Sequence, residues 1–118
     1  MINVDELKDH IYDVVGAIYS IDELRRLISP IAKNHGLNKV YLFGSYARGS
    51  ATENSDVDLC IDASSLRGLF AIGTLYADLE DTLQKKLDIV TFGSLKYNTD
   101  EKFVNNLHKD EVLIYEYI

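Results

Sequence analysis

Two aspartates one residue apart, Asp56 and Asp58, follow a glycine–serine pair, Gly44–Ser45, after a gap of ten residues. In a β-strand, residues two apart point to the same face, so we expect these two carboxylates to lie side by side. Like charges at that separation repel, and burying them costs on the order of several kcal/mol unless a cation neutralises them. Carboxylate oxygens favour Mg²⁺, whose coordination is usually completed by water and substrate phosphates.

A third carboxylate, Asp88, stands at the start of a later apolar run and would join the first two if the two strands were neighbours. Gly44 and Ser45 offer the complementary half of such a site. A glycine turn that opens a short helix exposes backbone N–H groups, and the serine hydroxyl adds a donor, which suits phosphate oxygens. The sequence contains no G-x-x-x-x-G-K-[ST] run, so a P-loop is excluded.

Helices and strands alternate along the chain in a way that predicts an α/β (α+β) fold with a small mixed β-sheet flanked by helices. Ser20 and Glu23 form a capping box, and Ser29–Pro30 is interpreted as the start of a new short helix ending at Gly36, because proline is unfavourable inside a helix. We expect strands over 39–43, 56–62, 87–92 and 112–117, and helices over 4–19, from 20, over 30–36, over 66–83 and from a Thr99 cap onwards.

The strand over 56–62 alternates strictly, with aspartates on one face and apolar residues on the other, and is expected to pair with 39–43 like a hairpin. Asp62 shares the aspartate face but lies further along, as a strand-end residue. We predict a single domain over 1–118, with an N-terminal helix over 1–19 and the core over 20–118.

Charge and composition narrow the class of protein. The 118 residues carry a formal net charge of -7, which repels polyphosphate backbones, so we expect no direct binding of nucleic acid. The sequence has one cysteine, Cys60, and neither a run of ~20 apolar residues nor a signal-peptide pattern. We therefore expect a cytoplasmic protein that is not bound to a membrane.

The run LFGSYARG, the DVD tripeptide that begins after a ten-residue gap from Ser45, and the later Asp88 resemble the nucleotidyltransferases of the polymerase-β type. The likeness is greatest to the minimal nucleotidyltransferases (MNT), single-domain prokaryotic members whose partners commonly carry a HEPN domain in toxin–antitoxin pairs. The resemblance implies that Gly44 and Ser45 hold the triphosphate of ATP. It also implies that Asp56 and Asp58 bind two Mg²⁺ ions, and that Asp88 joins one ion and helps to deprotonate the acceptor hydroxyl.

The implied reaction is an in-line displacement at the α-phosphate with pyrophosphate as the leaving group. We expect a Mg²⁺-dependent enzyme that transfers AMP to a hydroxyl, a tyrosine, of a HEPN-domain toxin, as its antitoxin in a hetero-oligomer. Two other functions stay open: a non-catalytic antitoxin that neutralises its partner by complex formation, and transfer to a small molecule such as an aminoglycoside. The intact carboxylates favour the enzyme, and the short chain disfavours the small-molecule substrate.

Three neighbours of these residues have open roles. Arg48 is a candidate phosphate contact, because a guanidinium suits phosphate geometry, or it pairs with Glu53 or another surface acid. Tyr46, beside the glycine turn, could reach a nucleotide or belong to the edge of the core. Cys60 is interpreted as a small side chain beside the site rather than as a nucleophile.

Overall fold

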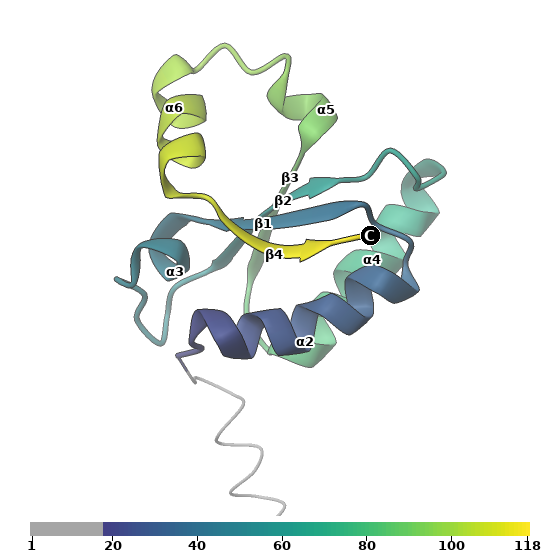
Figure 1. The fold of residues 1–118 in the computed structure, drawn as a ribbon, viewed down its shortest axis with the longest axis horizontal. Coiled ribbons are helices and arrows are strands. Elements are labelled where there is room, and N and C mark those ends of the chain that lie inside the picture. Colours follow the sequence, from purple (N-terminus) through teal and green to yellow (C-terminus); the bar gives the residue numbers. More distant parts are fainter. Residues whose placement is uncertain (1–17) are drawn as a thin grey trace, which may run out of the picture.

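Four strands form one mixed sheet in the computed structural model, which describes residues 18–118. The strand order is β3-β2-β1-β4; β1 pairs antiparallel with β2 and with β4, and β2 pairs parallel with β3 (Figure 1). The predicted class, a small mixed sheet flanked by helices, is confirmed. The strands are β1 (Lys39–Phe43), β2 (Val57–Asp62), β3 (Leu87–Thr91) and β4 (Val112–Glu116).

Helices cover both faces of the sheet (Figure 1). The longer helices α2 (Ile21–Asn34) and α4 (Gly68–Leu83) lie on one face, and the short helices α5 (Phe92–Leu95) and α6 (Glu101–Asp110) lie on the other. Helix α3 (Gly44–Arg48) follows β1 directly at one end of the sheet. None of the helices described within residues 18–118 is long and apolar enough to cross a membrane.

The main core lies between the sheet and the helices α2 and α4. Val57, Leu59 and Ile61 of β2 are buried there, at exposures of 1% or less. Because side chains alternate along a strand, Asp58 is turned to the opposite face, where α5 and α6 lie. A slip of the strand by one residue would move the carboxylate into the core, so burial of the apolar residues fixes the register that presents Asp58.

Helix α2 runs without a break through Pro30, so the predicted new helix beginning at that residue is wrong. Leu24, Ile28 and Ala32 recur every four residues and are buried against the sheet. Burial of this stripe offsets the hydrogen bond that Pro30 cannot donate to the preceding turn. The capping box at the helix start is confirmed, since the Glu23 backbone N–H donates to Ser20 Oγ at 3.1 Å.

Several other element boundaries differ from the prediction: β2 begins at Val57 rather than at 56, α4 begins at Gly68 rather than at 66, and β4 ends at Glu116 rather than at 117. Asp100, rather than Thr99, caps α6: its carboxylate accepts the Phe103 backbone N–H at 3.1 Å, and a carboxylate also interacts favourably with the positive end of a helix. The third strand ends at Thr91, whose hydroxyl caps the short helix α5, which the sequence analysis did not anticipate. The helix expected over 4–19 lies outside the described residues, apart from two non-helical residues at its end.

Candidate active site

The parallel pairing of β2 with β3 brings two of the three predicted carboxylates together. Asp58 and Asp88 are direct partners in the register of this pair, 30 residues apart in the sequence. The Val57 backbone N–H donates to the Lys86 carbonyl at 2.9 Å, which fixes the two strands at their first residues. Asp56 immediately precedes β2, and its charge acts on Asp58. The predicted neighbourhood of the two strands is confirmed.

Asp58 is the most perturbed of these carboxylates. Its pKa is raised to about 6, chiefly by burial and then by the negative charges of Asp88 and Asp56. The positive charge of Arg48 lowers the pKa and offsets part of this rise. Asp88, by contrast, is open to solvent. In the protein without ligands, ionised Asp58 is therefore held in a site that disfavours its charge, and a bound cation would remove that penalty.

This perturbation predicts a pH dependence of stability. A carboxyl group whose folded-state pKa exceeds its unfolded value stabilises the fold while protonated and loses that contribution as pH rises, here from about 4 to about 6. We expect the free energy of unfolding to fall by on the order of 1 kcal/mol between pH 5 and pH 7.5, a value discounted for partial solvent screening. Urea denaturation of the wild type and of Asp58→Asn at both pH values measures it. Equal pH slopes in the two proteins would contradict the assignment.

The turn at Gly44 lies against the Asp58 carboxylate. Gly44 follows Phe43, which is the β1 partner of Asp58, and has a φ of +73°. A Cβ at this position would lie 2.1 Å from Asp58 Oδ2 and 3.0 Å from its Cγ. The backbone that opens α3 and the central carboxylate are therefore in van der Waals contact, which makes the predicted phosphate-binding turn and the predicted metal-binding carboxylate parts of one site.

Arg48 forms an ion pair with Asp110 at an Nη1–Oδ2 distance of 3.0 Å. Arg48 therefore pairs with an acidic residue, as one of the two predictions had it. The acid is Asp110 of α6 and not Glu53. The pair joins α3 to α6 across the site, and Arg48 remains near enough to lower the pKa of Asp58. A phosphate contact by Arg48 stays a prediction, and it would require the guanidinium to share or exchange Asp110.

The carboxylates fit a metal that substrate helps to hold. Within residues 18–118, no three Asp, Glu, His or Cys side chains are grouped so that they could hold a metal ion by themselves. Crowded carboxylates beside a turn that only glycine fits nevertheless match Mg²⁺, which keeps several waters and is commonly bound through one or two carboxylates plus substrate phosphates. The donor set is therefore incomplete without phosphate oxygens, as expected for an ion that arrives with a nucleotide.

Lys85 is a candidate positioning residue of the site that the sequence analysis did not single out. Its side chain is 8% exposed, and its Nζ donates to the Glu53 carbonyl at 2.7 Å. The contact ties the loop before Asp56 to the segment that leads into β3 and Asp88. Lys85 lies midway between two leucines in an alternating run, Leu83 and Leu87, both of which are buried. This alternation could have indicated that Lys85 is buried as well.

We expect Lys85→Met to lower the transfer rate about tenfold, because the loop carrying Asp56 loses its anchor and small displacements of reacting groups are costly. Methionine keeps the packing of the buried stem, and the exposed Glu53 carbonyl can bind water, so the free energy of unfolding should change by less than about 1 kcal/mol. Transfer kinetics and urea denaturation measure the two effects. Lys86→Met, at the exposed neighbour, is the control, and equal activities would contradict the positioning role.

The remaining candidates have structural roles. Cys60 is buried, and burial, followed by the charge of Glu111, raises the pKa of its thiol to about 11, so it is not poised as a nucleophile. Tyr46 is 3% exposed within the main core, which corrects the suggestion that it reaches a nucleotide. Asp62 accepts the Ser64 backbone N–H at 3.1 Å and caps the end of β2, as predicted.

Known proteins with similar sequences are nucleotidyltransferases. The family described as Polymerase beta, Nucleotidyltransferase matches residues 26–117. A provisionally named protein adenylyltransferase of Methanocaldococcus jannaschii is 33% identical over 86 residues, which cover 73% of this chain and 92% of that relative. Protein adenylyltransferase MntA of Thermococcus cleftensis is 31% identical over 84 residues, which cover 68% of this chain and 85% of the relative.

Solved structures agree on the fold. A structure described provisionally as a minimal nucleotidyltransferase has a TM-score of 0.62 at 27% identity, covering 80% of this chain and 95% of that one. A chain from the complex of tri-AMPylated Shewanella oneidensis HEPN toxin with MNT antitoxin has a TM-score of 0.58 at 18% identity, covering 82% and 73%. With its glycine turn set against paired carboxylates, the chain belongs to the polymerase-β nucleotidyltransferase family, among the minimal members, and is a nucleotidyltransferase.

Proposed function

We propose that this nucleotidyltransferase moves AMP from ATP to a tyrosine hydroxyl of a HEPN-type toxin and so acts as its antitoxin. The observation that supports this most directly is the contact of the Gly44 turn with Asp58, which is itself paired with Asp88. The contact supports the proposal because a turn suited to phosphate and acidic groups suited to a metal ion would then act at one spot. The relatives named protein adenylyltransferase and the HEPN–MNT complex with the same fold support the acceptor class.

Each residue has a stated task in the proposed reaction. Gly44 and Ser45 bind the triphosphate through backbone N–H groups and the hydroxyl, and Asp56 and Asp58 would hold two Mg²⁺ ions, one of them shared with Asp88. When bound, Mg²⁺ supplies stabilisation of the charge on the attacking and leaving oxygens. The solvent-open Asp88 accepts the proton of the acceptor hydroxyl.

The bonds balance in a single displacement. The acceptor oxygen forms a bond to the α-phosphorus of ATP, and the bond from that phosphorus to the bridging oxygen of the β-phosphate breaks. Pyrophosphate leaves with the electron pair, and the acceptor proton goes to the carboxylate of Asp88.

A protein acceptor fits the open side of the site. Asp88 is exposed on β3, which is an edge strand of the sheet among the described residues. A hydroxyl free in solution would gain little rate from such a site, whereas one held by a docked protein gains from proximity and alignment. The net charge of -7 favours a basic partner surface.

Mass spectrometry of the partner tests the proposal. The protein, ATP, Mg²⁺ and a HEPN-type partner are incubated, and the partner should gain AMP on tyrosine and lose nuclease activity even after the nucleotidyltransferase is removed. The Asp56→Asn, Asp58→Asn double variant is the matched control. An unmodified partner that the double variant inhibits equally well would establish the alternative, a non-catalytic antitoxin that acts by complex formation.

Metal binding should depend on nucleotide. We expect Mg²⁺ to bind the free protein weakly and to bind at least about tenfold more tightly in the presence of ATP, because the carboxylates leave much of the octahedral shell to phosphate oxygens and water. Isothermal titration calorimetry with a non-hydrolysable ATP analogue measures the difference. Tight binding of Mg²⁺ to the free protein with no gain from the nucleotide would contradict this arrangement.

A further inference from the structure

An ion pair ties the last residue of α6 to the last residue of α3. Asp110 Oδ2 lies 3.0 Å from Arg48 Nη1, although the two residues are 62 apart in the sequence. They meet because β1 leads into α3 while α6 leads into β4, and these two strands pair antiparallel from Leu42 and Val112. The pair therefore lies at the end of the sheet where the Gly44 turn begins α3 (Figure 1).

Packing fixes α6 against the strand that enters this turn. Leu107, in the last turn of α6, is 2% exposed and belongs to a small buried cluster with Phe43. The rings of Phe43 and Phe103 meet edge to face at a centroid distance of 6.1 Å. Since Phe43 directly precedes Gly44, the helix that carries Asp110 is held in a defined place relative to the turn.

The position of Asp110 is unfavourable for α6 itself. The carbonyl groups at the C-terminal end of a helix carry partial negative charge, which disfavours a carboxylate there. Asp100, whose carboxylate caps the start of the same helix, shows the favourable arrangement. The Asp110 side chain is nevertheless only 17% exposed, and a charge so far removed from water requires a partner. Its role therefore lies in the contact with Arg48 and not in the stability of its own helix.

The pair leaves most of the Arg48 guanidinium available. Within the part of the chain that the structure describes, this group donates to Asp110 through Nη1 alone, so Nε and Nη2 can still donate to a ligand. The Arg48 side chain is 51% exposed, and its charge lowers the pKa of Asp58. A long side chain that is already held loses less conformational freedom when it binds a ligand, and a guanidinium suits phosphate geometry.

We propose that Asp110 is a positioning residue for nucleotide binding: its carboxylate holds the Arg48 guanidinium beside the Gly44 turn, where the remaining N–H groups meet the triphosphate. The inference rests on the proposed function, in which ATP is the substrate. Asp110 itself touches no phosphate and acts through Arg48. An open site gains from this arrangement, since the ordering of Arg48 is complete before ATP binds.

Binding of ATP and of inorganic tripolyphosphate, each with Mg²⁺, to the full chain tests this role in a double-mutant cycle. Asp110→Asn should weaken the binding of both probes about tenfold, because a charge-assisted contact to the phosphates loses its orientation. In the Arg48→Gln background, the same substitution should have no further effect. Asp110→Glu, which keeps the charge, should retain most of the affinity for both probes.

Thermal denaturation without ligand separates positioning from a structural tie. Asp110→Asn should melt close to the wild type, because it removes a charge that the helix end disfavours and leaves Arg48 half exposed to water. A melting temperature that falls together with the affinity, or a variant that fails to fold, would make the pair a structural tie and overturn the positioning role.

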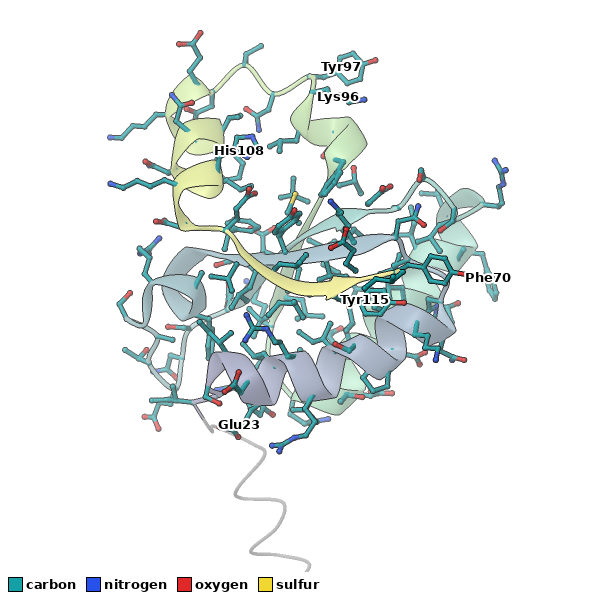
Figure 2. All side chains as sticks on the ribbon, in the orientation of Figure 1. Glu23, Phe70, Lys96, Tyr97, His108 and Tyr115 are labelled. Atoms are coloured by element: carbon teal, nitrogen blue, oxygen red, sulfur yellow. The ribbon has the colours of Figure 1, made fainter. Side chains whose placement is uncertain are left out.

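Glu111→Gln is the matched control. Glu111 is the next residue along the chain and lies 3.4 Å from His108 Nδ1, and Figure 2 shows His108 on the side of α6 that faces α5. The substitution removes the same unit of charge and so reproduces any general change in the field of the protein. Both affinities should equal those of the wild type.

The remaining outcomes each decide a claim. Affinities of Asp110→Asn that equal or exceed those of the wild type would overturn the positioning role, and a gain would mean that Asp110 competes with the phosphates for Arg48. An equal loss in the Arg48→Gln background would also overturn it, because Asp110 would then act independently of Arg48. If the cycle behaves as expected and no HEPN-type partner gains AMP, the inference stands and the proposed acceptor fails. Wild-type protein that binds neither probe would overturn the nucleotide site, and this inference with it.

Discussion

Asp58→Asn is expected to lower AMP transfer by at least about a hundredfold and to raise the melting temperature of the ligand-free protein. The substitution removes a carboxylate charge that, in the proposed reaction, helps to hold Mg²⁺. It also removes the repulsion that Asp88 and Asp56 exert on a half-buried carboxylate, whose pKa stands at about 6 for that reason together with burial. Labelled-ATP transfer assays and thermal denaturation without metal measure the two opposite effects.

Asp62→Asn is the control for this prediction. Asp62 lies on the same strand and face, but hydrogen bonds from the Ser64 hydroxyl and backbone lower the pKa of its carboxyl group, so its charge is favoured there. Its substitution should weaken the end of β2 and leave transfer close to the wild-type rate. If Asp58→Asn melted at a lower temperature than the wild type, or retained its activity, the carboxylate would be structural rather than part of the reaction.

Gly44→Ala should reduce transfer at least as severely, by about a hundredfold or more, and should also lower the free energy of unfolding by about 2–3 kcal/mol. The added Cβ would lie 2.1 Å from Asp58 Oδ2, so either the turn or the carboxylate must move, and both belong to the site. The positive φ of +73° adds strain for any residue with a Cβ. Transfer kinetics, ATP binding and urea denaturation report the change.

Gly49→Ala is the control that separates the effect of the contact with Asp58 from the effect of backbone strain. Gly49 has nearly the same φ, +76°, at the end of α3, but a Cβ there would meet no atom within 4 Å. In both variants the strain of a Cβ at positive φ should lower the free energy of unfolding by about 1 kcal/mol. Only Gly44→Ala should also lose most of its transfer activity. Comparable losses of activity in the two would show that the turn is sensitive to strain alone and that the approach to Asp58 is unimportant.

The parts of the site that could be predicted from the sequence depend on local periodicity. Alternation over 56–62 indicated a strand and its exposed face, and the glycine–serine pair indicated a turn, because both patterns reflect backbone geometry within a few residues. The adjacency of Asp88 was predicted only on the condition that two strands are neighbours. The structure meets that condition through the parallel crossover by α4.

The missed features depend on contacts distant in sequence. Arg48 pairs with Asp110, 62 residues away, and Lys85 donates to the Glu53 carbonyl across 32 residues, and no local pattern specifies either partner. Pro30 was misinterpreted for the same reason: local preference argued for a helix boundary, and the buried stripe against the sheet outweighed it. Burial placed Tyr46 in the core, and a contact distant in sequence gave Arg48 an acidic partner, neither of which the sequence displays.

The place of β4 in the sheet bears on how this protein acquires activity during synthesis. β1 lies between β2 and β4, so one of its two edges pairs with a strand that is translated more than 65 residues later. A nascent chain that lacks β4 exposes the backbone of the strand leading into the Gly44 turn, and contacts of such long sequence separation form late in folding. We therefore expect the Gly44 turn to take its final position only after β4 has paired with β1, so that a chain truncated before Val112 is inactive.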